Sequence, residues 1–153
     1  MHVKVESSVP VFTPKLEVLQ NSQYFHFRDD RKEQKKLVQM RLVSEGGSAF
    51  VIISPRSFPL WSTLYLEFQE KKIIFGKYNG ISAKETTKKD ATLTGVLDLW
   101  LFFDGLFVYV GKQGNATVQS ETLAKFFSKQ MPEVNHLGFS IKGTGEWTIK
   151  ECE

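Results

Sequence analysis

Side chains that could bind a metal ion or act as a nucleophile are few and far apart in this sequence. None of the three histidines, His2, His26 and His136, has a second ligand at the spacing of a short zinc motif. A β-sheet could bring His26 and His136 together, although a half-exposed histidine on a strand is the commoner situation. The one cysteine, Cys152, has no base beside it to activate its thiol. We therefore expect no bound metal, no cofactor and no cysteine nucleophile.

The aspartates give a weak basis for acid–base chemistry. General acid catalysis needs a carboxyl group in a pocket that raises its pKa. Asp29 and Asp30 fall in a highly charged run, and Asp98 and Asp104 fall in a predicted hairpin, where aspartates are usually solvated. A binding function is therefore the expectation, and an enzyme is the alternative.

Aromatic side chains form the stronger candidate site. Tryptophan and tyrosine present a flat apolar ring with a polar tip, which suits both sugar rings and partner proteins. In the strands predicted below, several of them alternate with aliphatic residues and so share the face opposite the core. The candidate ligand or interface residues are Trp61, Tyr65, Tyr78, Trp100, Phe102, Phe107 and Tyr109.

The longest apolar run spans residues 96–111 and contains four of these candidates. Its Asp104-Gly105 pair is typical of a two-residue type I′ hairpin loop, because glycine accepts a positive φ and aspartate tolerates it. That loop would place Trp100, Phe102, Phe107 and Tyr109 on one face of the hairpin. The other, aliphatic face would hold Leu99, Leu101, Phe103, Leu106, Val108 and Val110.

Something is expected to cover the four rings, because burying each large side chain is worth about 1.5 to 3 kcal/mol. The candidates are a helix, a second copy of the chain and a ligand. A helix is predicted from Ser120 to Gln130, where Leu123, Phe126 and Phe127 have helical spacing and Pro132 ends the pattern. We expect this helix to be the cover, because it begins within ten residues of the hairpin.

The rest of the chain shows strand-like alternation every eight to twelve residues. The predicted strands cover residues 15–19, 23–28, 37–43, 49–53, 62–69, 72–78, 81–86, 135–141 and 146–151. The run from Asp29 to Lys36 is a solvated loop, and the last two strands pair across Gly143-Thr144-Gly145. Trp147 alternates with Ile149 and is expected in the core with Phe139. This pattern predicts an all-β fold, an antiparallel β-sandwich of the jelly-roll or galectin type with one short helix.

The length and composition fit a soluble protein with one domain over residues 1–153. A net charge of +3 is too small to favour nucleic acid as a partner. No apolar run approaches the roughly 20 residues of a membrane span, and residues 1–12 lack a signal-peptide core. A cytoplasmic protein and a secreted one with its leader removed both fit, and the Asn115 glycosylation triplet matters only in the second case.

A set of motifs resembles the farnesoic acid O-methyltransferase-like domain. The motifs are Trp100 in a strand, a turn at Gly105, the strand end Val110-Gly111, then Val134 with Gly138-Phe139, and finally Gly145-x-Trp147-x-Ile149. The resemblance covers residues 65–152 and implies a β-sandwich module. The family name implies methyl transfer, but that chemistry commonly uses a glycine-rich turn after an early parallel strand with an acidic partner. The one G-x-G, Gly143-Thr144-Gly145, is better explained as a hairpin.

These observations together predict a non-catalytic binding or interaction module. Its expected partner is a carbohydrate or another protein, and self-association is possible. A small-molecule-modifying enzyme, the methyltransferase of the family name, is the alternative.

Overall fold

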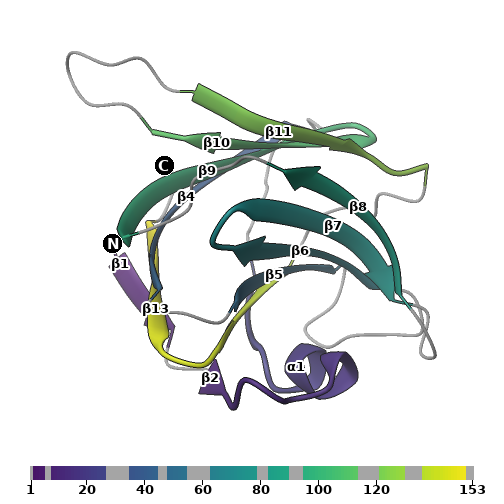
Figure 1. Cartoon of the computed structure of the whole chain (residues 1–153). Coiled ribbons are helices and arrows are strands. Elements are labelled where there is room, and N and C mark those ends of the chain that lie inside the picture. Colours follow the sequence, from purple (N-terminus) through teal and green to yellow (C-terminus); the bar gives the residue numbers. More distant parts are fainter. Residues whose placement is uncertain are drawn as a thin grey trace.

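The chain folds into two β-sheets packed face to face, with one short helix on the outside (Figure 1). The computed structural model describes residues 2–5, 8–26, 35–44, 48–54, 63–78, 83–89, 95–113, 121–129 and 136–150. Pairing is antiparallel everywhere in the described part except between β2 and β12. The predicted fold class, an antiparallel β-sandwich with one short helix, is confirmed.

The six-stranded sheet bends around the other sheet in Figure 1 and ends at the β10–β11 pair. In spatial order its strands are β1 (His2–Val5), β13 (Gly145–Lys150), β4 (Lys35–Ser44), β9 (Gly95–Asp104), β10 (Phe107–Lys112) and β11 (Glu121–Phe127).

The seven-stranded sheet forms the other layer. Its order is β2 (Ser8–Val9), β12 (His136–Lys142), β5 (Ser48–Ser54), β6 (Thr63–Gln69), β7 (Lys72–Tyr78) and β8 (Ala83–Lys89), and β3 (Gln23–His26) pairs with β12 as well.

The core lies between the two sheets and follows the alternation of the strands. Val38, Met40 and Leu42 are buried on β4, as their spacing predicts. Trp147 is fully buried, its ring lies 5.5 Å from that of Phe139, and its indole Nε1 donates a hydrogen bond to the carbonyl oxygen of Ser140 at 3.0 Å. The predicted core position of Trp147 is therefore confirmed.

The central hairpin has a different register from the predicted one. Asp104 pairs with Phe107, so the two-residue loop is Gly105-Leu106 and not Asp104-Gly105. Gly105 occupies the first loop position with φ +59°, which glycine adopts without strain. Leu106 consequently lies at the exposed tip of the loop and not on the aliphatic face. Because the register moves by two residues, every other hairpin residue keeps its predicted face.

The predicted helix at residues 120–130 is wrong, because residues 121–127 form the strand β11. Leu123, Phe126 and Phe127 have helical spacing, yet Phe126 is buried while Phe127 is half exposed. The register with β10 shifts between Val110 and Gly111, and Leu123 is the unpaired extra residue of this bulge. Leu123 is partly buried against the core, and pairing of residues 121–127 with β10 outweighs the local helix preference.

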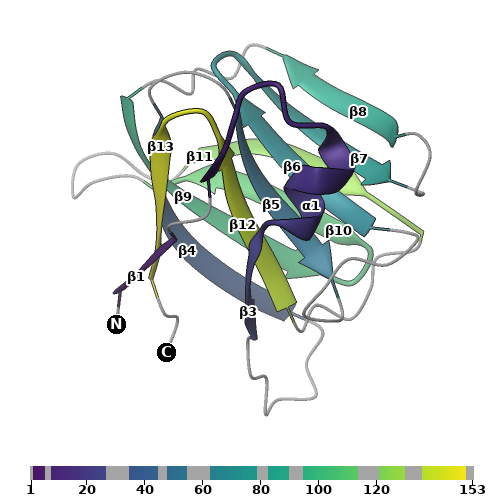
Figure 2. The ribbon, with the colours of Figure 1, turned by 90° about the horizontal axis from the view of Figure 1, so that it is seen from below.

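The one helix of the described chain is α1 (Lys15–Gln20), where the sequence predicts a strand at residues 15–19. Pro14 occupies the N-cap position, and Asn21 ends the helix. Figure 2 shows α1 lying across the outer face of the seven-stranded sheet. Val18 and Leu19 are buried there, in a second apolar cluster with Phe50, Ile52 and Tyr65. Packing against this face therefore decides in favour of a helix that is too short to be stable alone.

The last two strands, β12 and β13, do not pair with each other as predicted, because they belong to different sheets. The chain crosses from one sheet to the other through Gly143 and Gly145, and Gly143 has a φ of +90°. A Cβ on Gly145 would lie 2.6 Å from the carbonyl oxygen of Val43, so only glycine allows this approach.

Candidate functional site

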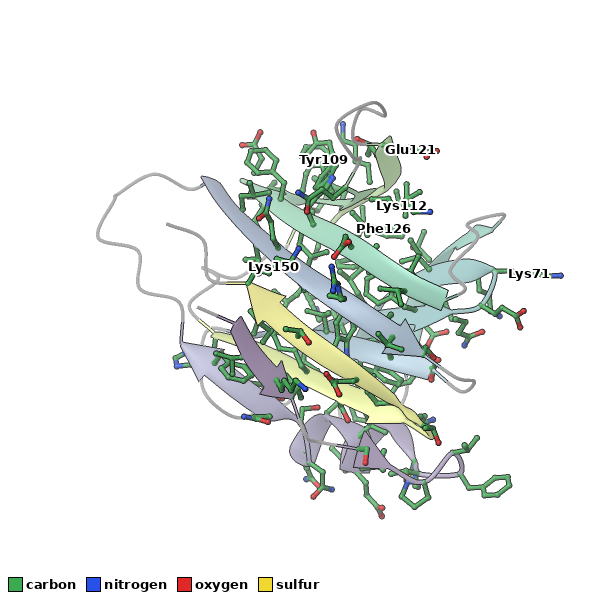
Figure 3. The ribbon with its side chains drawn as sticks, turned by 90° about the vertical axis from the view of Figure 1, so that its left-hand side faces the viewer. Lys71, Tyr109, Lys112, Glu121, Phe126 and Lys150 are labelled. Atoms are coloured by element: carbon green, nitrogen blue, oxygen red, sulfur yellow. The ribbon has the colours of Figure 1, made fainter. Side chains whose placement is uncertain are left out.

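Four of the predicted candidate residues come together on the outer face of the six-stranded sheet. The register pairs Phe102 with Tyr109, and their ring centroids lie 6.0 Å apart. Phe107 follows on β10 with its ring 6.3 Å from that of Tyr109. Trp100 precedes Phe102 on the same side of β9. Figure 3 shows Tyr109 on the outside of the sandwich, well away from the β6–β7 turn that carries Lys71.

Three further residues belong to this face and were missed from the sequence. Phe127 lies opposite Phe107 with ring centroids 5.2 Å apart, and Leu37 lies opposite Phe102. Phe127 is 49% exposed and Leu37 is 44% exposed. Lys125, opposite Tyr109, places its Nζ 4.3 Å from the Phe107 ring centroid and 5.3 Å from that of Tyr109.

We call this surface the aromatic face. Its members are Leu37, Trp100, Phe102, Phe107, Tyr109, Lys125 and Phe127. Reading residues 121–127 as a strand is the one change that would have revealed Phe127 and Lys125, because both then share the outer side of β11. The rings that were expected under a helix are instead only partly buried.

Trp100 is seated on the backbone of Gly111, its partner in the register between β9 and β10. A Cβ at position 111 would lie 1.8 Å from the indole Cζ2, so the ring fills the space that a side chain would take. Its Nε1 is buried and has no hydrogen-bond partner among the described residues. The ring is thus held flat at one end of the aromatic face.

A charged group adjoins the aromatic face next to Trp100. Asp98 Oδ1 accepts hydrogen bonds from Arg41 Nε at 3.0 Å and from Lys150 Nζ at 3.3 Å. The hydrogen bond from Arg41 holds the pKa of Asp98 below its usual value, against a smaller opposing effect of burial. Arg41 and Lys150 belong to β4 and β13, so three strands supply this cluster of two cations and one anion.

The other described candidates lie on the other sheet. Tyr65 and Tyr78 are on the seven-stranded sheet, and Trp61 lies outside the described residues. Tyr65 has no exposed surface and packs beneath α1, and Tyr78 packs against the same cluster. The structure therefore separates the six described candidates into two groups on opposite outer faces, and the four rings of the aromatic face are the larger group.

A polar network surrounds the Tyr65 hydroxyl. Tyr65 donates to Glu85 Oε1 at 2.5 Å, and Lys15 Nζ donates to the Tyr65 hydroxyl at 3.0 Å. Burial, and then the hydrogen bond to Glu85, raises the pKa of Tyr65 well above its usual value. Burial alone would raise the pKa of Glu85, but hydrogen bonds from Lys15 and Tyr65 outweigh it and lower that pKa. Each of these three side chains has a hydrogen-bond partner inside the protein, so the network links α1 to β6 and β8 of the seven-stranded sheet.

Two of the histidines meet in the register of the described strands. His26 lies opposite His136 in the β3–β12 register, and the side chain of His26 is outside the described set. No three His, Cys, Asp or Glu side chains among the described residues are grouped so that they could hold a metal ion. The described helix is also too short to cross a membrane.

The fold resembles several solved structures at low sequence identity. The TRIM65 PSpry domain matches with a TM-score of 0.55 at 11% identity, over 86% of this chain and 72% of that one. Galectin LEC-6 of Caenorhabditis elegans matches with a TM-score of 0.55 at 12% identity, over 86% and 92%. The GH43 protein BlXynB of Bacillus licheniformis matches with a TM-score of 0.51 at 11% identity, over 78% of this chain and 27% of that one.

The sequence comparisons are negative. No protein-family model matches the chain, and no curated protein sequence matches it. At 11 to 12% identity the structural matches establish the β-sandwich fold alone. The function therefore has to be inferred from the chemistry of the protein surface and not from the fold.

Proposed function

We propose that this protein is a non-catalytic binding module and that the aromatic face is its binding surface. The observation that carries the proposal is a continuous set of rings, Phe102, Tyr109, Phe107 and Phe127, each within 6.3 Å of the next, on an outer sheet face. Apolar patches of this kind on a protein surface mark interaction sites, and aromatic residues are enriched in the centre of interfaces.

A protein partner fits the aromatic face better than a glycan does. Sugar hydroxyl groups that lose water need hydrogen-bond partners. Among the exposed groups of this face, only the Tyr109 hydroxyl and the Lys125 ammonium supply them, because leucine and phenylalanine have no polar atoms. Apolar side chains of a protein surface need no such partners and gain from contact with the rings.

A glycan is the second candidate, supported by a different part of the same sheet. Gln39 lies opposite Trp100, and the Arg41, Asp98 and Lys150 cluster adjoins them. A flat indole beside amide, guanidinium and carboxylate groups is a chemistry that can bind a sugar ring. The galectin among the structures of similar fold makes this candidate worth testing.

The resemblance to the farnesoic acid O-methyltransferase-like domain remains part of the proposal, as a resemblance in fold type. Its motif residues have packing roles here: Trp100 rests on Gly111, and Trp147 and Phe139 lie in the core. The Gly143-Thr144-Gly145 segment links β12 to β13, and the Gly143 amide donates to the carbonyl oxygen of Val9 at 2.9 Å. These roles support a shared sandwich and give no support to methyl transfer.

Fragment mapping by NMR tests the proposed surface. We would titrate the ¹⁵N-labelled full chain with 3-methylindole and record the amide shifts. The shifts are expected to cluster on β9, β10 and β11, and Phe127→Ser is expected to weaken them. Phe12→Ser is the matched control, because Phe12 is 95% exposed but lies before α1 and outside the aromatic face. Shifts confined to the seven-stranded sheet, or equal effects of the two variants, would contradict the proposal.

A glycan array and light scattering then separate the partners. A hit on the array that Trp100→Ala abolishes and Phe127→Ser leaves intact would favour the glycan candidate. A dimer in light scattering that Phe127→Ser converts to a monomer would identify a second copy of the chain as the partner.

A further inference from the structure

Lys125 is the group that restricts which partner can cover the aromatic face. Its ammonium lies over the rings of Phe107 and Tyr109, at 4.3 and 5.3 Å from their centroids. Lys125 is exposed and takes part in none of the ion pairs formed among the described residues. Water and the two rings therefore solvate this cation in the free protein.

Any partner that covers these two rings also removes water from the ammonium above them. Burying a charge without a counter-charge is costly, and contact with the ring faces replaces only part of the lost hydration. A carboxylate on the partner would offset this cost, because it would accept a charge-assisted hydrogen bond from the Lys125 ammonium. An apolar partner without an acidic group would lose affinity at this point.

The end of the aromatic face next to Trp100 is also positively charged. Arg41 and Lys150 share the single carboxylate of Asp98, which leaves this cluster with one excess positive charge. The chain as a whole carries a net charge of +3. Asp104 lies opposite Phe107 at one end of the face and Glu121 is the first residue of β11, and neither forms an ion pair with Lys125 among the described residues.

We infer that the partner is a segment of another protein in which Asp or Glu residues flank apolar side chains. This inference rests on the proposed function and narrows it to one class of ligand. A second copy of the chain fits less well, because a symmetric contact brings two Lys125 ammonium groups into the same interface. Nucleic acid fits less well too, because Asp98, Asp104 and Glu121 stand on the same sheet and the net charge is small.

Four probes test the charge requirement. Three are twelve-residue peptides that share their tryptophan and leucine positions and differ only in the residues between them, which are all Glu, all Gln or all Lys. The fourth is a thymidine dodecanucleotide. Affinities for the full chain are measured by fluorescence anisotropy at low salt and in 1 M NaCl, and the site is located by amide shifts.

The Glu peptide is expected to bind about fivefold more tightly than the Gln peptide at low salt, and high salt should remove the difference. Lys125→Gln should abolish the preference, and Lys125→Glu should transfer it to the Lys peptide. Lys71→Glu should leave the preference unchanged, because Lys71 is also an exposed lysine but lies at the β6–β7 turn of the other sheet (Figure 3).

The possible failures are distinguishable. Equal binding of the Glu and Gln peptides at the aromatic face would overturn the inference and leave the proposed surface standing. Tighter binding of the oligonucleotide to that face would replace a protein partner with a nucleic acid. No amide shift on β9, β10 or β11 with any probe would overturn both the inference and the proposed function.

Discussion

The indole of Trp100 occupies the space that a side chain at Gly111 would need, with Cζ2 only 1.8 Å from where a Cβ would stand. The two residues are cross-strand partners, so the tryptophan compensates for the missing side chain of the glycine and its own orientation depends on that absence. One end of the aromatic face is therefore built by this pair, and a change at either residue affects the other.

Gly111→Ala should displace the Trp100 ring and destabilise the protein by about 1 to 3 kcal/mol in urea unfolding, as overpacking usually does. In a Trp100→Ala background the same change should cost much less, so a double-mutant cycle should show strong coupling. Gly105→Ala is the control, since its Cβ would meet nothing within 4 Å and only the positive φ opposes it. Additive effects of the two substitutions on the free energy of unfolding would contradict the contact between the Trp100 indole and the Gly111 backbone.

The adjacent residues Phe126 and Phe127 should respond very differently to serine. Phe126 is buried and stacks on Phe75 with ring centroids 5.2 Å apart, so Phe126→Ser should cost about 3 kcal/mol or more. Phe127→Ser should change the free energy of unfolding by less than about 1 kcal/mol. Similar losses at both positions would favour the helix that the sequence predicts here, because neighbours on a helix share much of one side.

Trp147→Ala should cost roughly 3 to 5 kcal/mol, because it empties a fully buried site between Phe68 and Phe139. Trp147→Phe keeps part of the ring contact but leaves the Ser140 carbonyl oxygen without its donor, so an intermediate loss is expected. Chemical denaturation measures both. An unchanged midpoint for Trp147→Ala would mean that β13 faces the other way.

Tyr109→Glu should leave the melting temperature close to that of the wild type. The side chain is only partly buried, and the new carboxylate would lie opposite the Lys125 ammonium in the register. Differential scanning calorimetry and light scattering on the same samples provide the test. A large loss of stability in a monomer would indicate that part of the chain covers this face.

Asp98 should make stability depend on acid pH. Its pKa is lower in the folded protein than in the unfolded chain, so its contribution is present above about pH 4 and is lost as the pH falls through the lower folded value. The contribution should stay under about 1 kcal/mol, since water screens a side chain that is 35% exposed.

Urea unfolding between pH 6 and pH 2 compares the wild type with Asp98→Asn, which should show a flatter pH dependence. Arg41→Gln should raise the carboxyl pKa of Asp98 in an NMR titration, because it removes the strongest hydrogen bond to that group. An unmoved titration curve would show that Arg41 and Asp98 do not interact in solution.

Alternation along the strands was sufficient to place the faces of β9 and β10 and to put Trp147 in the core. The hairpin loop was misplaced by one residue because Asp104-Gly105 and Gly105-Leu106 both satisfy the local turn chemistry. The error did not change the faces, because moving the register by two residues returns each side chain to the same side of the sheet. The candidate rings of this hairpin were therefore identified correctly as neighbours despite the wrong pairing.

The sequence by itself determined the all-β class, the buried side of the strands and the cluster formed by Trp100, Phe102, Phe107 and Tyr109, since a period of two residues is a local property. Tertiary structure decided where the helix lies and which residues complete the aromatic face. Residues 15–20 are helical because Val18 and Leu19 pack on the seven-stranded sheet, and residues 121–127 are extended because they pair with β10 across a bulge. Such short segments fit both a helix and a strand, and only contacts between residues far apart in the chain favour one.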